Sequence, residues 1–145
     1  MAVDRYAAAH PVAVVTGASA GVGRATARAY GARGWSVGLL ARGRDGLEAA
    51  RREIEELGGR ALALVTDVAD PDAVEAAAER VEAELGPIEV WVNNAMITSY
   101  SPFERMTAAE YRRITEVTYL GYVHGTRTAL RRMRRRERGT IVQVG

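Results

Sequence analysis

Three glycines, Gly17, Gly21 and Gly23, follow a run of apolar residues at positions 12–16 and precede an alanine-rich stretch. Glycine adopts backbone dihedrals that other residues avoid, and its missing side chain lets a ligand approach the backbone closely. A helix that begins near Val22 would direct its free N–H groups and its positive dipole end at this turn. The pattern predicts an anion-binding turn suited to a pyrophosphate. The alternative is a tight strand–helix connection that binds nothing.

The same turn also has the form of a hydrolase nucleophile elbow. Residues 17–21 match G-x-S-x-G, in which Ser19 would be the nucleophile and His124, far downstream, the base. The oxyanion hole of such hydrolases takes one N–H from a loop after an earlier strand. No strand is predicted before residues 12–16, so the sequence favours phosphate binding over hydrolysis.

The elements that must position this turn are short apolar runs alternating with helical patterns. Helical spacing of apolar residues indicates three helices, and a capping box at Thr107 and Glu110 begins a fourth that runs to an arginine cluster. The predicted strands are residues 12–16, 36–40, 61–66, 88–92 and 140–144. Their nearly continuous apolar character is typical of strands buried on both faces. We therefore expect an α/β fold with a doubly wound parallel sheet, and a ligand beyond the carboxyl ends of its strands.

Three spaced motifs then indicate a family. Thr16-Gly17-x-x-x-Gly21-x-Gly23, Asp67-Val68 after the third strand and Asn93-Asn94-Ala95 after the fourth resemble the short-chain dehydrogenase/reductase family. The resemblance covers nearly the whole chain. It implies a single Rossmann-type domain over residues 1–145 that binds NAD(P). A complete member would transfer a hydride between the nicotinamide and a small carbonyl or alcohol substrate.

The resemblance also assigns roles along the cofactor. The backbone around Ser19 and the glycine turn would hold the pyrophosphate and the adenosine ribose. Asp67 would bond the adenine amino group and Val68 would flank the ring. Asn93 would tie the central strands together, and Asn94 and Ala95 would lie along the cofactor.

Arginines after the second predicted strand bear on the choice of cofactor. NAD sites place a carboxylate there to bind the ribose hydroxyl, whereas this chain has Arg42 and no carboxylate before Asp45. A guanidinium is a bidentate partner for a phosphate, so Arg42, with Arg44 as a second candidate, favours NADP(H) over NAD(H). The alternative for Arg42 is a solvated side chain beside a helix start. The predicted cofactor-binding residues are Gly17, Ser19, Gly21, Val22, Gly23, Arg42, Arg44, Asp67, Val68, Asn94 and Ala95.

The chain departs from the family's catalytic pattern, which uses a serine, a tyrosine and a lysine four residues after the tyrosine. All twenty basic residues here are arginine, so the lysine is missing. The serine would come just after the strand at 140–144. We therefore expect a Rossmann sheet truncated after its fifth strand, incomplete at its C-terminus and inactive as it stands. The alternative is a nucleotide-binding module without catalysis.

Two substitutions add to this departure. Thr118 stands where the family has a helical asparagine, either to hold a water or as a satisfied interior hydroxyl. Met96 stands where the family has a glycine, where it would crowd the ligand or simply pack. Truncation would also leave the fifth strand uncovered, so we expect a homo-oligomer.

Composition excludes several other classes. There is no cysteine and there are only two histidines, so no metal site is expected. Residues 131–138 carry a net charge of +5 and leave −3 on the rest, and no aromatic residue lies among the arginines, so nucleic-acid binding is not expected. No run is long enough to span a membrane, and Met1 to His10 lacks a signal-peptide core. We expect a cytoplasmic protein.

Overall fold

Five parallel strands form the sheet in the computed structural model, which describes residues 10–145. In chain order they are β1 (Val12–Thr16), β2 (Ser36–Ala41), β3 (Arg60–Val65), β4 (Ile88–Asn93) and β5 (Thr140–Gln143). Their order across the sheet is β3-β2-β1-β4-β5, and every neighbouring pair is parallel. The chain therefore winds outward from β1 in one direction, returns to β4 on the other side and continues to β5. This confirms the predicted doubly wound sheet, with ends that differ from the predicted ones by a residue or so.

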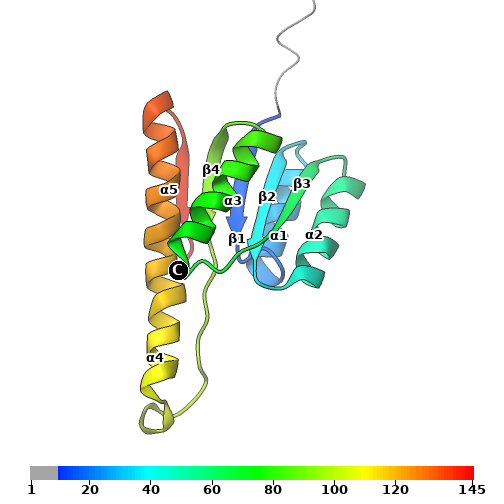
Figure 1. Ribbon diagram of the computed structural model, residues 1–145. Coiled ribbons are helices and arrows are strands. Elements are labelled where there is room, and N and C mark those ends of the chain that lie inside the picture. The colour runs from blue at the N-terminus through cyan, green and yellow to red at the C-terminus, as the bar shows by residue number, and fades with distance from the viewer. Residues whose placement is uncertain (1–9) are drawn as a thin grey trace, which may run out of the picture.

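Helices cover both faces of this sheet (Figure 1). They are α1 (Gly21–Gly31), α2 (Arg44–Glu56), α3 (Pro71–Glu84), α4 (Ala108–Ile114) and α5 (Gly121–Arg136), with a short 3-10 turn at Phe103–Arg105. One buried cluster packs α3 and α5 against β1, β2 and β4, and a second packs α1 and α2 against the other face. Alternate residues of β1 divide between them, since Val12 and Val14 join the first cluster and Val15 joins the second. The unbroken apolar strand runs are explained by this double coverage.

Local signals fix the starts of two helices. The Asp70 side chain accepts from the backbone N–H groups of Asp72 and Ala73, and Pro71 occupies the first helical position of α3. Thr107 and Glu110 form the reciprocal capping box that begins α4. Both caps satisfy N–H groups that an unsupported helix end would leave free.

The predicted fourth helix is a single run from α4 through α5, with one irregular section. Residues Thr115–Leu120 form a π-helical turn between the two α-helical segments. The α4 end projects beyond the carboxyl edge of the sheet, and α5 packs beside α3 and β4 (Figure 1). Among the described residues, no helix combines the length and apolar character that crossing a bilayer requires. The signal-peptide prediction concerns Met1–His10, and residues 1–9 of that segment lie outside the described part.

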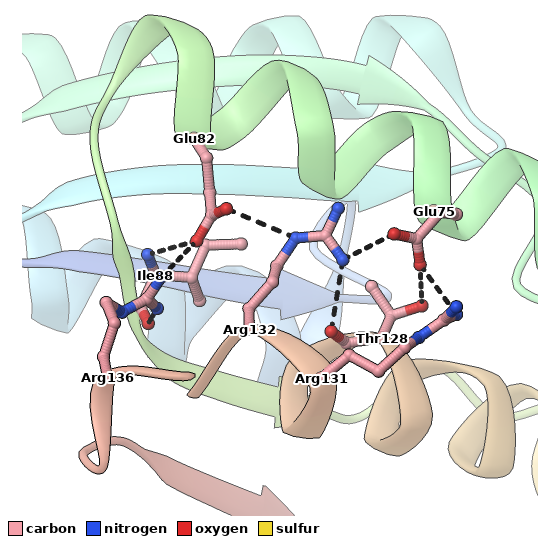
Figure 2. A network of polar contacts seen from close by, with 7 residues as sticks. All are labelled: Glu75, Glu82, Ile88, Thr128, Arg131, Arg132 and Arg136. Atoms are coloured by element: carbon pink, nitrogen blue, oxygen red, sulfur yellow. Dashed lines mark hydrogen bonds and ion pairs between the residues drawn. The ribbon is translucent and has the colours of Figure 1, made fainter. Parts of the chain in front are cut away.

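The arginine cluster at 131–138 is largely paired with acidic side chains. Arg132 lies between α5 and α3, with its Nη1 atom 2.6 Å from Glu75 Oε1 and its Nε atom 3.4 Å from Glu82 Oε2. Arg131 adds a contact to Glu75 at 3.0 Å, and Arg136 pairs with Glu82 at 2.9 Å. Figure 2 shows these side chains forming one network between the two helices. The cluster therefore fastens α5 to α3, a role that the sequence analysis did not foresee.

Candidate functional site

A groove of about 510 Å³ lies at the carboxyl edge of the sheet. The glycine turn after β1 forms part of its wall, together with residues that follow β2, β3 and β4. Because β2 and β4 lie on opposite sides of β1, this is the point at which the strand order reverses. Ligands of open α/β sheets bind at such switch points. Of the predicted residues, those lining the groove are Gly17, Ser19, Gly21, Val22, Arg42, Asp67, Val68, Asn94 and Ala95.

The glycine turn has the geometry that its sequence predicts. Gly17 and Gly21 have φ angles of +68° and +54°, which favour glycine strongly. A Cβ on Gly23 would lie 2.2 Å from the Gly17 carbonyl oxygen and 2.5 Å from Asn94 Nδ2, so a side chain there would force the turn apart. A Cβ on Gly21 would instead enter open space. Gly23 therefore closes the turn, while Gly21 leaves room beside it for a ligand.

The N-terminus of α1 opens on this space. Its N-cap residue, Ala20, makes no side-chain cap, and the first turn of the helix carries no acidic residue. The first N–H groups of a helix lack partners within it and carry partial positive charge. The turn therefore presents uncapped donors to the groove, which is what an anion requires.

A hydroxyl joins the two strands that flank the switch point. Thr16, at the end of β1, is 2% exposed, and its Oγ1 atom accepts from the N–H groups of Asn94 at 2.9 Å and Ala95 at 3.0 Å. It also donates to the Val92 carbonyl at 3.3 Å. Asn94 Nδ2 returns a bond to the Thr16 carbonyl at 3.1 Å. The groove wall after β4 is thereby fixed to β1.

The link between the central strands was assigned to Asn93, but Asn94 and Thr16 make it. Asn93 is buried and points the other way, where Nδ2 donates to Thr126 Oγ1 at 3.1 Å and to Gln143 Oε1 at 2.9 Å. Successive strand residues face opposite sides, so two neighbouring asparagines cannot share one partner. Asn93 instead joins β4 to α5 and β5.

Two arginines follow β2, and the structure separates them. Arg42 lines the groove, whereas Arg44 is the first residue of α2 and is not among the lining residues. The N-cap of α2, Gly43, makes no side-chain cap, and a Cβ on it would lie 4.0 Å from Ser19 Oγ. The turn after β1 and the start of α2 therefore lie side by side, with Arg42 beside both.

Asp67 holds its charge at the groove. Its Oδ1 atom accepts from the Ala69 N–H at 3.0 Å and its Oδ2 atom from Arg113 Nη2 at 2.9 Å. Burial alone would raise the pKa of the Asp67 carboxyl, but these two bonds and the charges of Arg113 and Arg42 outweigh it and hold the pKa below its usual range. The side chain is an ionised acceptor at neutral pH. Arg113 also lines the groove, and no motif or spacing in the sequence points to it.

Thr118 is engaged rather than free. Its hydroxyl donates to the Ile97 carbonyl at 3.0 Å and accepts from the Ile97 N–H at 3.1 Å. This agrees with the interpretation of Thr118 as a satisfied hydroxyl, because its single donor is already used. Met96 lines the groove with half of its surface exposed, so it borders the ligand space instead of packing in the core.

The hydrolase arrangement does not form. Ser19 lies in the groove wall, but His124 lies on α5, where its Nδ1 atom is 2.9 Å from the Val68 carbonyl oxygen. A carbonyl oxygen can only accept, so Nδ1 carries the proton and donates. His124 is not one of the groove-lining residues, and its bond serves the turn after β3.

Comparison with known proteins gives consistent matches over this chain. A cis-4-hydroxycyclohexanecarboxylate dehydrogenase of Sinomonas cyclohexanicum is 39% identical over 137 residues, which cover 94% of this chain and 55% of that protein. An NAD⁺-bound xylitol dehydrogenase structure superposes with a TM-score of 0.87 at 29% identity, covering 92% of this chain and 52% of that one. An alcohol dehydrogenase of Thermococcus sibiricus in complex with 5-hydroxy-NADP gives 0.84 at 31% identity, covering 92% and 57%.

The chain thus spans about half the length of the relatives it matches. The two structures carry different nicotinamide cofactors, one NAD⁺ and one of the NADP type. The family model for short chain dehydrogenases matches residues 11–145, from the start of β1 to the end of the chain. The chain belongs to the short-chain dehydrogenase family.

Proposed function

We propose that this chain binds NADP(H) in the groove at the switch point, as the cofactor-binding part of an oxidoreductase. The observation that carries the proposal is the uncapped N-terminus of α1, which opens on the groove beside the space left by Gly21. Backbone donors at a helix start suit the cofactor's pyrophosphate. Nicotinamide cofactors are those that the family uses, which supports the proposal from a second direction.

The preference for NADP(H) over NAD(H) rests on Arg42. Arg42 lines the groove where the adenosine ribose of a bound dinucleotide would lie, next to the uncapped start of α2. A 2′-phosphate there would gain charge-assisted bonds from Arg42 and from α2 backbone N–H groups. Arg44 is a weaker candidate, since it lies outside the groove lining. Asp45, the first carboxylate after β2, is exposed in the first turn of α2 and is not among the groove-lining residues.

A titration with the two reduced cofactors tests this preference. We expect Arg42→Ala to weaken NADPH binding by about tenfold to a hundredfold and to leave NADH binding unchanged, because only NADPH carries the extra phosphate. The measurement is nicotinamide fluorescence on titration of each variant. Arg52→Ala, which removes an exposed arginine farther along α2, is the matched control and should change neither affinity. Equal affinity of the unaltered chain for NADH and NADPH would refute the preference.

The reaction of the complete protein would be hydride transfer between the nicotinamide and a small carbonyl or alcohol substrate. When bound, the cofactor supplies the hydride, and this chain's own residues bind and orient it. The 145 residues contain no lysine, so they do not supply the family's tyrosine–lysine pair. Thr118, which stands where the family has a helical asparagine, already donates its hydroxyl proton to the Ile97 carbonyl and does not replace that asparagine as a donor. The second candidate, a binding module without catalysis, therefore describes the chain by itself.

An activity measurement separates the two candidates. We expect the 145-residue chain to bind NADPH without oxidising it in the presence of a panel of aldehydes, ketones and 3-oxo thioesters. NADPH absorbance should decay at the same rate with and without the protein. The control is a Gly23→Val variant, in which a side chain would force the glycine turn apart. Turnover of any of these substrates by the unaltered chain that is lost in this variant would contradict the interpretation as a binding module without catalysis.

A further inference from the structure

The long helix formed by α4, the π-helical turn and α5 contacts the turn after β3 at three points. Arg113 Nη2 donates to Asp67 Oδ2 at 2.9 Å, and His124 Nδ1 donates to the Val68 carbonyl at 2.9 Å. A Cβ on Gly121 would lie 2.7 Å from Val68 Cγ2, so the helix backbone also packs closely on Val68. These partners are 46 to 56 residues away in the chain. The position of Asp67 is therefore set by the helix as well as by β3.

The carboxylate of Asp67 is fixed at both oxygens. Torsion about the last bond of an aspartate is soft, so a free carboxylate samples a broad range of orientations. Here the Ala69 N–H occupies one lone pair of Oδ1 and Arg113 occupies one of Oδ2. Each carboxylate oxygen has a second lone pair, so the group keeps acceptor capacity at the groove that it lines.

We propose that Arg113 is a positioning residue of the adenine subsite: its guanidinium orients the Asp67 carboxylate so that this group accepts from the 6-amino group of adenine. The inference rests on the proposed function and on the role that the family resemblance implies for Asp67, a bond to the adenine amino group. Arg113 acts through Asp67. Its Nη2 group donates to the carboxylate, and its side chain is one-third exposed at the groove wall.

The groups around Arg113 make it suited to this task. It shares a helix face with Val117, four residues on, which is buried and also lines the groove. Val68, which is buried, lines the groove as well. An apolar surface of this kind accommodates a flat base, and only an oriented polar group at its rim can tell one purine from another. The carboxylate held by Arg113 is that group.

Competition between two purine dinucleotides tests the inference. Hypoxanthine carries a carbonyl oxygen where adenine carries the 6-amino group, and a carboxylate cannot donate to it. The probes are NADPH and reduced nicotinamide hypoxanthine dinucleotide phosphate, which have the same charge and the same phosphates. We expect the chain to prefer NADPH by about tenfold, and Arg113→Gln to reduce the preference to about twofold. Asp67→Ala should abolish it.

The control variant is Arg112→Gln, which removes the same charge one residue away from an exposed position and should keep the full preference. Arg113→Lys retains the charge without the planar fork and should give an intermediate ratio. Because both ligands compete for the same folded molecules, the ratio does not depend on how much of a variant is folded.

The outcomes distinguish the inference from the function on which it rests. If the unaltered chain binds neither dinucleotide, the proposed function fails. Suppose instead that the unaltered chain prefers NADPH, that Asp67→Ala loses this preference and that Arg113→Gln keeps it. Only the role of Arg113 is then overturned. If the preference for NADPH survives in Asp67→Ala, Asp67 does not contact the adenine amino group, and the inference about Arg113 is refuted as well.

Discussion

At the scale of single residues, Thr16 shows how much one hydroxyl can hold. It ends an otherwise apolar strand, and three backbone groups at the end of the neighbouring strand β4 meet at its Oγ1 atom. The sequence displays Thr16 in the motif but gives no sign of these partners, which are more than seventy residues away. Its contacts position the Asn94-Ala95 wall of the groove, so stability and binding are coupled at this side chain.

Replacement of Thr16 by valine, which keeps its shape, should therefore be costly. Thr16→Val leaves the N–H groups of Asn94 and Ala95 without their acceptor, and we expect a loss of about 2–4 kcal/mol in the free energy of unfolding. Urea denaturation measures it. Ser36→Ala is the contrasting variant, since the buried Ser36 Oγ atom has no hydrogen-bond partner among residues 10–145 and its removal should be neutral or slightly stabilising. Equal losses from the two variants would contradict this account.

At the scale of elements, the network of Figure 2 shows why α5 stays against α3. Arg132 joins Glu75 to Glu82 in this network, and Glu75 accepts from Thr128 at 2.8 Å as well as from Arg131 and Arg132. Burial would raise the pKa of the Glu75 carboxyl, but hydrogen bonds from Arg132 and Thr128 and the charges of Arg132 and Arg131 prevail and lower it. The unfolded chain lacks these partners, so its Glu75 carboxyl binds protons at a higher pH than the folded one.

This difference predicts how acid affects the two helices. A depressed folded pKa adds stability that is fully present above the unfolded value of about 4.3 and is lost as pH falls through the folded value. Glu75→Gln should therefore destabilise the chain at pH 7, and its deficit should shrink as the pH is lowered below about 4. Thermal unfolding across pH 7 to 3 measures the deficit. Glu79→Gln, at an exposed position of the same helix, should cost little stability at any pH. A loss of stability in Glu75→Gln that does not change with pH would refute the link between the Glu75 pKa and stability.

At the scale of the whole molecule, the sheet ends in a strand that is half open. β5 pairs with β4 on one side only, and Val142 is 37% exposed. An edge strand with unpaired backbone groups and apolar side chains is a surface for association. We propose that copies of this chain pair through β5, in keeping with the expected homo-oligomer.

Sedimentation at increasing protein concentration tests this association. We expect the average mass to rise with concentration, and Val142→Lys to hold the chain closer to a monomer, because a charge on an edge strand opposes pairing. Leu57→Lys, at an exposed apolar position after α2, should associate like the unaltered chain. A monomer at all concentrations would argue against association through this edge.

How far the sequence predicts the molecule depends on how local each signal is. The apolar runs, the capping box at Thr107 and the φ-positive glycines act within a few residues, and these elements lie where they were predicted. The link to Thr16 that Asn94 makes in place of Asn93 could not be foreseen, because it depends on which way each side chain points at the end of β4. Arg113 and the α3–α5 network were also missed, since their partners come from distant segments and charges carry no periodic signature.

The π-helical turn at Thr115–Leu120 changes the direction in which the side chains of α4 point relative to those of α5. A wide turn of this kind holds one residue more than an ordinary one, and each residue of an α-helix advances it by about 100°. The extra residue thus rotates the end that carries Arg113 relative to the end that carries Arg132, so one continuous rod serves the ligand groove at one end and α3 at the other. Removing one residue from this turn should rotate the Arg113 end by about 100° and carry its guanidinium away from Asp67, while Arg132 keeps its contact with Glu75 on α3.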